Sequence, residues 1–345
     1  MNEKQFRAAI EQRIADWLAQ RLGEAATPEV GLMIERMQQL ILRAGKRSRP
    51  RLLFLAYQAY GGQRAEELVD VGLALELQHQ FLLVHDDIMD NDTVRYDGPN
   101  MLGYYRQDFP EKESDIADSM ALMAGNVLYT YACQAILRHP TLSDAHKVAL
   151  LTLLQETNLG VHAGQQLDIV NVLALAPEIT KEKLLVTDYL KTSLYSVRLP
   201  MQAGAELAGA PNAERGKIDI FARNFGILYQ LVDDYSDYFQ NASSFDNHPK
   251  YRDFKQGKIT YPLLAAFEHA GAEDAAFLRA EAGNKRLSDD EMQKITAILE
   301  RSGAKAAAAE QIEQYHELAL RALESLGISP ADRRPFKHML DSFRI

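Results

Sequence analysis

Apolar residues recur at spacings of three and four along nearly every stretch longer than a dozen residues, as at Val69, Leu73 and Leu77. This spacing places apolar side chains on one face of an α-helix. The alternating pattern of a half-buried strand is missing from the sequence, and glycine and proline interrupt the helical pattern only briefly. The sequence therefore predicts an all-α fold, a bundle of a dozen or so helices joined by short loops.

Three of the predicted helices, at 66–89, 114–137 and 219–239, are apolar around more than half of their circumference. Helices of this kind belong in the middle of a bundle, where other helices surround them. A prior of roughly 150 residues per domain would suggest two domains for a chain of 345 residues. No stretch has the composition of a linker, so we expect a single helical domain that covers residues 1–345.

The composition excludes several classes of partner. Hydrophobic residues make up 47% of the chain and charged residues 25%, which are ordinary globular values, and the net charge of −10 argues against nucleic acid. No apolar run reaches the roughly 18 residues that span a bilayer, so we expect no integral membrane segment. The N-terminal stretch lacks the apolar core of a secretory signal, and the single Cys133 cannot form an internal disulfide. We therefore expect a soluble cytoplasmic protein.

Two aspartate clusters of the same design follow apolar helical runs, in the sequences DDIMD and DDYSD. The first and last aspartates of each cluster are four residues apart, so their carboxylates leave the same face of a helix. Carboxylates in such a poorly hydrated setting raise their pKa values or destabilise the fold unless a cation lies between them. Ligand sets of one or two carboxylates per ion suit Mg²⁺, which usually also binds substrate phosphates. The six aspartates are Asp86, Asp87, Asp90, Asp233, Asp234 and Asp237.

Basic and polar residues near these clusters indicate two diphosphate sites. His79 lies two helical turns before Asp86 and about 20° from its direction, so it shares the face of the carboxylates. The run from Gly45 to Arg51 has four basic residues at a loop-to-helix transition, where free N–H groups also favour an anion. Further cations and donors are Arg95, Gln230, Lys258 and the pair Lys191 and Thr192, which we expect to open a helix after a break at Asp188 and Tyr189.

At this point the sequence resembles the trans-isoprenyl diphosphate synthases, or polyprenyl synthetases. Between about residues 40 and 270 it contains, in the family's order, GKRSRP, HQFLLVHDDIMD, GQQLD, LKTSL, YQLVDDYSD and GKITYPLL. The resemblance implies an isoprenoid-synthase-type bundle around a central cavity, usually a homodimer. It also implies three Mg²⁺ ions that bridge the two DDxxD motifs to an allylic diphosphate.

The resemblance assigns a role to each matching position. Asp86, Asp90 and Asp233 match the metal ligands, and Asp87, Asp234 and Asp237 complete the two motifs. Lys46, Arg49 and His79 match the residues that hold isopentenyl diphosphate. The positions that match residues around the allylic diphosphate are Arg95, Lys191, Thr192, Gln230 and Lys258, of which the last four are expected to act in catalysis.

The implied reaction is the head-to-tail (1′-4) condensation of isopentenyl diphosphate with an allylic diphosphate. Metal ions and basic side chains neutralise the leaving diphosphate, and an allylic cation forms in an apolar cavity. The double bond of isopentenyl diphosphate attacks the cation, and a proton is lost to the released diphosphate. Two alternatives remain open, a class I terpene cyclase and a non-catalytic subunit of a hetero-oligomeric synthase.

Three positions bear on substrate binding and product length. Tyr96 occupies the place of a second arginine in the family, and a charge-assisted contact of that kind contributes roughly 1.5 to 3 kcal/mol. Arg106 and Arg252 are the substitutes that we consider. Phe81 and Leu82 lie where the family places the side chain that stops chain growth, and this pattern resembles synthases of geranylgeranyl diphosphate (C20), with farnesyl diphosphate (C15) as the next candidate.

Overall fold

The structure is a computed structural model that describes residues 1–43, 45–110, 114–173, 179–239 and 250–345. The chain forms two compact units, the first from Met1–Leu154 and Pro200–Ala210 and the second from Gln155–Leu199 and Pro211–Ile345. The expectation of one domain over 1–345 stays a prediction, because a unit defined by its contacts need not fold by itself. The predicted interruptions at 176–177 and 241–249 lie outside the described residues.

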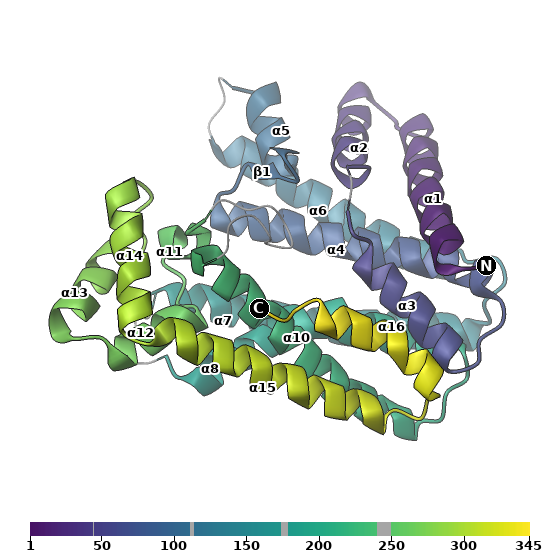
Figure 1. Ribbon diagram of the computed structural model, residues 1–345. Helices are drawn as coiled ribbons and strands as arrows, with labels where there is room; N and C mark the ends of the chain where they lie inside the picture. Colours follow the sequence, from purple (N-terminus) through teal and green to yellow (C-terminus); the bar gives the residue numbers. More distant parts are fainter. Residues whose placement is uncertain (44, 111–113, 174–178, 240–249) are drawn as a thin grey trace. The chain divides into compact units, whose positions relative to one another are not determined.

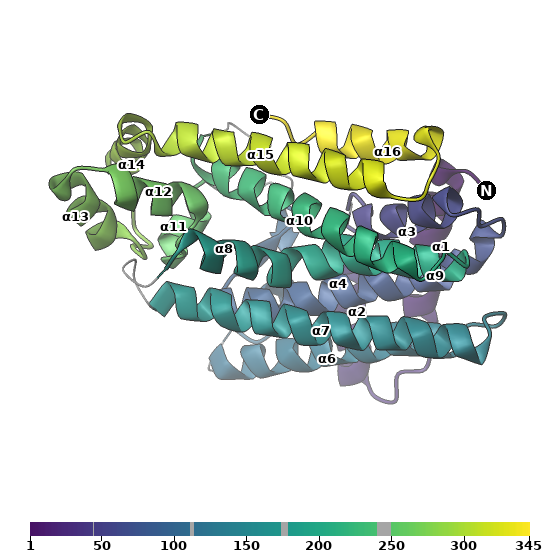
Figure 2. The same cartoon turned by 90° about the horizontal axis from the view of Figure 1, so that it is seen from below.

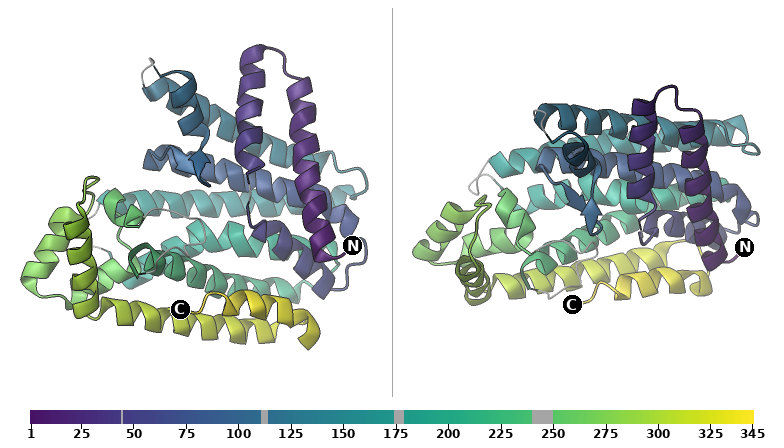
Figure 3. Two further views of the ribbon diagram at one scale, coloured as in Figure 1. Left: turned by 45° about the horizontal axis from the view of Figure 1, so that its top comes forward. Right: turned by 90° about the horizontal axis from the view of Figure 1, so that it is seen from above.

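The first unit is built from helices and one short hairpin (Figure 1). Its elements are α1 (Glu3–Gly23), α2 (Pro28–Ile41), α3 (Ser48–Ala59), η1 (Ala65–Leu68), α4 (Val69–Asp90), β1 (Val94–Arg95), β2 (Gly98–Pro99), α5 (Met101–Asp108), α6 (Ser114–Leu137), the beginning of α7 (Asp144–Leu173) and α9 (Leu199–Leu207). Within this unit α4 packs along α6, and α1 and α2 lie side by side (Figure 3).

The second unit is entirely helical in its described part. It contains the rest of α7, α8 (Lys181–Asp188), the π-helix η2 (Tyr189–Arg198), α10 (Ala213–Phe239), α11 (Arg252–Gln256), α12 (Tyr261–His269), α13 (Ala272–Glu281), α14 (Asp289–Arg301), α15 (Ala304–Ser325) and α16 (Pro330–Asp341). The helix α10 packs against η2 and α15, and α16 lies along α15 (Figure 2).

Local sequence explains where several helices begin. Asn2 and Ser288 form capping boxes at α1 and α14, in which the side chain of the cap and that of the third helical residue each accept a hydrogen bond from the backbone of the other. Thr27 and Ser329 cap α2 and α16, and both helices have proline in their first turn. The predicted helical bundle is therefore confirmed.

The α4 helix has the buried surroundings that its sequence predicts. Leu73, Ala74 and Leu77 are fully buried, and small residues on α6 allow the two helices to approach closely. A Cβ atom built at Gly125 of α6 would lie 2.5 Å from Cδ2 of His85 on α4. The lack of a side chain at this position is therefore what brings α6 against the end of α4 that carries the first aspartates.

The prediction that other helices surround 114–137 is wrong for one side of α6. Its Ala121, Ala124 and Leu128 are buried, but Met123 is 56% exposed and Leu137 54%. The segment Asp115–Leu137 is the one described helix that is long and apolar enough to cross a membrane by length and composition. That is weak support for a span, because core helices of soluble proteins meet the same criterion and the buried side of α6 packs on α4.

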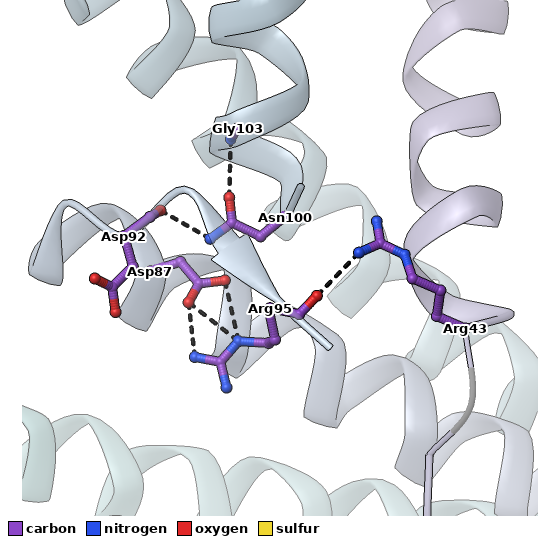
Figure 4. Close-up of polar contacts among 6 residues, drawn as sticks. All are labelled: Arg43, Asp87, Asp92, Arg95, Asn100 and Gly103. Atoms are coloured by element: carbon purple, nitrogen blue, oxygen red, sulfur yellow. Dashed lines mark hydrogen bonds and ion pairs between the residues drawn. The ribbon is translucent and has the colours of Figure 1, made fainter. Parts of the chain in front are cut away.

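Two further differences from the sequence predictions concern local structure. The chain does not break at Asp188 and Tyr189, because α8 continues directly into the π-helix η2. The sequence predicted no strands, because it lacks alternating apolar and polar residues. The strands β1 and β2 are only two residues long, too short to show such a pattern. Asn100 ties this hairpin to α5, since its Nδ2 donates to Asp92 O (2.8 Å) and its Oδ1 accepts from Gly103 N (2.8 Å), as Figure 4 shows.

Candidate active site

The first aspartate motif lies at the C-terminal end of α4, where Asn91 ends the helix in a left-handed conformation (φ 57°). Asp86 and Asp90 are half-buried, whereas the Asp87 side chain is only 1% exposed. One helical turn separates Asp86 from Asp90, so their carboxylates leave the same side of α4. Two carboxylates of the motif therefore keep contact with solvent, and the third is turned into the first unit.

Arg95 holds the buried Asp87 in place (Figure 4). Nη2 of Arg95 donates to Oδ1 of Asp87 at 2.7 Å, and Nε lies 3.1 and 3.3 Å from the two carboxylate oxygens. Burial lowers the pKa of the Arg95 guanidinium, but the Asp87 carboxylate raises it by a larger amount. The net pKa is raised, so Arg95 stays charged. Asp87 thus supports the motif through a fixed cation, while its own binding of metal stays a prediction.

The hairpin that carries Arg95 has an unusual turn. Arg95 pairs with Gly98 across β1 and β2, and both residues between them, Tyr96 and Asp97, are left-handed (φ 53° and 57°). Two such residues in succession are the pattern of a type I′ turn, in which an aromatic residue is uncommon. The residue that stands in place of the family's second arginine is therefore a turn residue.

The two arginines that we considered as substitutes lie in different units. Nη2 of Arg106 donates to Oδ1 of Asn91 (2.7 Å) and lies 3.2 Å from Oδ1 of Asp118, so Arg106 reaches the end of α4 directly after the first motif. The backbone N–H of Arg252 donates to Oδ1 of Asp237 at 2.9 Å, in the second motif. Compensation for Tyr96 by either arginine stays a prediction.

The basic run before α3 divides into inward and outward residues. Arg47 is left-handed (φ 51°) and buried, and its Nη1 donates to Oε2 of the buried Glu76 at 2.7 Å. Arg51 pairs with Glu3 at 2.7 Å. Lys46 is exposed and Arg49 is half-buried. Binding of isopentenyl diphosphate by Lys46 and Arg49 stays a prediction.

His79 lies close to arginines within the first unit. Burial lowers the pKa of His79 well below its ordinary value, and Arg49, Arg95 and Arg47 lower it further. The imidazole is therefore neutral at pH 7. A buried site with several guanidinium groups attracts an anion, and a neutral histidine there has one N–H to donate. The structure thus brings together His79, Arg49 and Arg95, which the sequence had predicted for two different substrates.

In the second unit, Lys191 and Lys258 meet at one carboxylate. Lys191 Nζ lies 2.7 Å from Oδ2 of Asp168 on α7, and Lys258 Nζ lies 3.6 Å from the same oxygen. Sequence reasoning named both lysines but gave no role to Asp168, the last residue of GQQLD. Gly164, the first residue of that motif, could have pointed to Asp168, because it lies one helical turn earlier on the same face of the helix.

Gly164 explains how α7 and η2 come close enough for this contact. A Cβ atom built at Gly164 would overlap the backbone nitrogen of Lys191 and lie 2.8 Å from the carbonyl carbon of Leu190. Backbone atoms cannot rotate away as the end of a side chain can. The absence of a side chain at Gly164 therefore lets the π-helix place Lys191 beside Asp168, and π-helical turns occur often at functional sites.

A second chain of hydrogen bonds joins η2 to the second aspartate motif. Thr192 Oγ1 donates to Oε1 of Gln230 (3.0 Å), and Gln230 Nε2 donates to Oδ1 of Asp234 (2.9 Å). The backbone N–H of Tyr261 also donates to Asp234, at 3.4 Å from Oδ2. Asp233 is half-buried, whereas Asp234 is buried. The second motif therefore repeats the first, with one carboxylate bound inside the protein and a neighbour that is partly exposed.

Asp234 and Asp237 of the second motif have raised pKa values. Burial and then the carboxylate of Asp253 raise the pKa of Asp234 to about 8, against a weaker opposing effect of Gln230. The same two causes raise the pKa of Asp237 well above its ordinary value. The pKa of Asp188 is also raised, first by burial and then by the nearby carboxylates of Asp234 and Asp168. A cation bound among these groups would relieve this repulsion, as the sequence reasoning expects.

The donor set fits Mg²⁺ that is shared with a phosphate ligand. Among the described residues no three His, Cys, Asp or Glu side chains gather closely enough to enclose a metal ion. Mg²⁺ is usually bound by one or two carboxylates, with waters and substrate phosphates as its other ligands, so a full protein cage is not required. In the second motif Oδ2 of Asp237 is buried and has no hydrogen-bond partner. This orphaned oxygen is the kind of atom that a cation would satisfy.

The two residues predicted to limit product length differ in their surroundings. Phe81 is buried, and its ring centroid lies 5.1 Å from that of Tyr129 on α6 and 4.6 Å from that of His85. Leu82 is half-buried. The ring of Phe81 therefore packs against α6.

This chain belongs to the polyprenyl synthetase family, because residues 31–299 match the model of that family. The short chain isoprenyl diphosphate synthase of Methanothermobacter thermautotrophicus is 30% identical over 307 residues, 88% of this chain and 87% of that protein. The (2E,6E)-farnesyl diphosphate synthase of Mycobacterium tuberculosis is 26% identical over 320 residues, 92% of this chain and 84% of that protein. The family resemblance and the enzyme class, a prenyltransferase, are thereby confirmed.

Solved structures confirm the fold. The crystal structure of geranylgeranyl pyrophosphate synthase from Corynebacterium glutamicum, complexed with isoprenyl diphosphate and magnesium, matches with a TM-score of 0.90. It covers 99% of both chains at 23% identity. The all-α bundle of the isoprenoid-synthase type is therefore the fold of this chain.

The raised pKa of Asp234 predicts how stability depends on pH. An unfolded chain releases this proton near pH 3.8 and the folded one near pH 8, so the folded state binds more protons between these values. The free energy of unfolding should therefore fall as pH rises from about 4 to about 8 in EDTA. Asp234→Asn removes this titration and should flatten the slope, as measured by urea unfolding at several pH values. An unchanged slope, equal to that of the exposed Asp97→Asn control, would contradict the assignment.

The contact at Gly164 predicts a packing defect. Gly164→Ala should lower the free energy of unfolding by about 2 kcal/mol, because the new methyl group meets the backbone of η2. Gly160→Ala on the same helix is the matched control, since its methyl group would meet side-chain atoms of Leu194 and Leu190 and no backbone atom of η2. Equal losses in the two variants, measured by urea unfolding, would show that α7 and η2 are not in backbone contact.

Proposed function

We propose that this protein is a Mg²⁺-dependent trans-prenyl diphosphate synthase, which condenses isopentenyl diphosphate with an allylic diphosphate head to tail (1′-4). The observation that carries the proposal is that each aspartate motif is accompanied, within its own unit, by cations suited to phosphate. Arg95, Arg49 and His79 accompany the first motif, and Lys191 and Lys258 meet near the second at Asp168. The activity named for the relative from Methanothermobacter thermautotrophicus supports the same reaction.

The metal sites follow from the exposure of the aspartates. Asp86, Asp90 and Asp233 are half-buried and are proposed as direct ligands. Asp87 and Asp234 are buried and hold those positions through hydrogen bonds within the protein. Asp237 is half-buried and keeps one oxygen without a hydrogen-bond partner, so it is proposed as a further ligand. Three Mg²⁺ ions are expected with bound diphosphate, and magnesium together with isoprenyl diphosphate in the Corynebacterium structure supports the metal. Bound Mg²⁺ would neutralise charge on the leaving diphosphate.

The protein side chains then have separate tasks. Lys191 and Lys258 exchange their contact with Asp168 for the allylic diphosphate and stabilise its negative charge as the carbon–oxygen bond breaks. The amide oxygen of Gln230 and the carbonyl groups of η2 stabilise the allylic cation. Lys46, Arg49 and His79 hold isopentenyl diphosphate, with the neutral imidazole as a hydrogen-bond donor.

We propose geranylgeranyl diphosphate as the product, with farnesyl diphosphate as the next candidate. Phe81 supports a limit on length, because its ring is buried and packed against Tyr129 and His85 and so has little freedom to move aside. The names of the relatives include synthases of both products. The geranylgeranyl diphosphate synthase of Sulfolobus acidocaldarius is 26% identical over 300 residues, 86% of each protein.

A homodimer in the cytoplasm is our proposal for the assembly and location of the enzyme. The exposed side of α6 supports the dimer, since Ile116, Met123 and Leu137 recur at multiples of seven residues and form one apolar stripe. A second copy of the same helix would cover that stripe. The acidic composition supports the location.

Turnover tests the function directly. Purified protein with Mg²⁺ and labelled isopentenyl diphosphate should elongate dimethylallyl, geranyl or farnesyl diphosphate, and chromatography of the dephosphorylated products gives their length. Elongation should disappear in EDTA. Unlabelled hydrocarbon formed from the allylic diphosphate alone would indicate a cyclase, and a lack of turnover with every substrate would indicate a non-catalytic subunit.

Substitution of Phe81 tests product length. Phe81→Ala should shift the products toward chains that are at least one five-carbon unit longer, because it removes the ring that is packed on Tyr129. Leu82→Ala is the comparison, since a helical wheel places Leu82 nearer to the direction of Asp86 than Phe81. Longer products from Leu82→Ala alone would assign the limit to Leu82 instead.

A further inference from the structure

Arg43, which lies outside every motif described above, binds the hairpin that carries Arg95. Its Nη1 donates to the carbonyl oxygen of Arg95 at 2.9 Å, and its Nη2 donates to the carbonyl oxygen of Pro99 (Figure 4 draws the first contact). Nη2 also donates to the hydroxyl of Tyr104 on α5 at 2.7 Å. Its Nε donates to the carbonyl of Gln39 on α2 at 3.1 Å. One guanidinium therefore ties α2 to both strands of the hairpin and to α5.

Gly98 supplies a second observation that points to the same contact. A Cβ atom built at Gly98 would overlap Nη1 of Arg43 and lie 2.9 Å from its Cζ. Gly98 is not among the residues with positive φ, so its backbone would accept any L-residue. An alanine at this position would therefore displace the Arg43 guanidinium without straining the turn.

The hairpin needs support from outside because it has little stability of its own. Its two strands pair over only two residues each, and a short isolated hairpin is marginally stable in water. Tyr96 and Asp97 in its turn are left-handed, which costs about 1 kcal/mol or more for each residue with a Cβ atom. Arg43 and Asn100 supply hydrogen bonds that hold the hairpin in this conformation.

The position of the hairpin matters for the first aspartate motif. Arg95 projects from β1 to the buried Asp87, which is the direct neighbour of Asp86 and lies less than one turn from Asp90. If the hairpin shifted, the Asp87 carboxylate would lose its cation in a buried setting, and the end of α4 would rearrange to hydrate it. The contact of Arg43 with the backbone of Arg95 therefore acts on the metal ligands through two intervening residues.

We propose that Arg43 is a positioning residue of the first aspartate motif, which fixes the hairpin so that Arg95 neutralises Asp87 and orients Asp86 and Asp90 toward Mg²⁺ and the allylic diphosphate. This inference rests on the proposed function of the motif. Residues that orient metal ligands from outside typically change metal affinity by about 10- to 100-fold when they are replaced. Arg43 touches neither the metal ligands nor the residues assigned to isopentenyl diphosphate in the contacts described here.

Arg43→Met tests the proposal, with Arg36→Met as the matched control. Arg36 lies on α2 itself, whereas Arg43 follows the end of that helix, and both guanidinium groups lie over the ring of Tyr104. Arg36, however, pairs with Asp108 at the far end of α5. Arg43→Met should raise the half-saturating Mg²⁺ concentration and the KM for the allylic diphosphate by about tenfold or more. Its kcat and its KM for isopentenyl diphosphate should stay within about threefold of those of the unaltered enzyme. Calorimetric binding of inorganic pyrophosphate in Mg²⁺ should weaken in parallel.

Gly98→Ala is a second variant that displaces the guanidinium while Arg43 itself remains. It should reproduce the shift in Mg²⁺ dependence, and the Arg43→Met/Gly98→Ala double variant should be no worse than Arg43→Met alone, because both changes break one contact. Additive effects, or a shift in Arg43→Met no larger than that in Arg36→Met, would overturn the proposal. Should Arg43→Met fail to fold, Gly98→Ala and Arg43→Lys carry the same comparison.

The two proposals can fail separately. An unaltered protein that binds pyrophosphate with Mg²⁺, and loses that binding in Arg43→Met, but never elongates an allylic diphosphate would retain the role of Arg43 and reject the synthase. An unaltered protein that elongates normally, with Arg43→Met equal to Arg36→Met in every constant, would retain the synthase and reject the role of Arg43. Absence of both turnover and pyrophosphate binding in the unaltered protein would reject both.

Discussion

Neutralisation of buried carboxylates is the constraint on which the rest of this structure depends. A carboxylate that loses its water must gain a cation, hydrogen bonds or a proton. The buried Asp87 is paired with Arg95, and the buried Asp234 accepts hydrogen bonds from two N–H groups and has a raised pKa. The half-buried Asp168 is paired with two lysines. Each solution brings a functional side chain to a defined place. The electrostatic cost of the aspartate motifs therefore organises the residues around them.

Close approach of other elements is the second requirement, and particular glycines make room for it. Gly125 brings α6 to His85, Gly164 brings α7 to the backbone of η2, and Gly98 makes room for Arg43. Only the last of these is near a turn. A methyl group at Gly164 would meet backbone, whereas at Gly125 or Gly98 it would displace a side chain. None of the three has a positive φ, so these glycines matter through packing and not through backbone conformation.

The helical fold could be predicted from the sequence because apolar periodicity is a local property. The central helices α4 and α10 coincide with two strongly apolar segments, and glycine or proline marks most of the loops. The same rule failed on one side of α6, because hydrophobicity shows that a face avoids water but not which surface covers it. It also missed the π-helix, since the apolar spacing of a short π-helical stretch differs little from that of the α-helices on either side.

The sequence by itself determined the fold class, the family and the identity of the residues that carry charge, because these follow from spacing and from residue types in a fixed order. Only the tertiary structure decided which aspartate of each motif is turned inward, that Asp168 receives both lysines, and that Arg43 holds the hairpin of Arg95. The physical reason is that such partners are far apart in the chain. Burial and pairing at one carboxylate depend on side chains that packing brings together, and no local pattern records them.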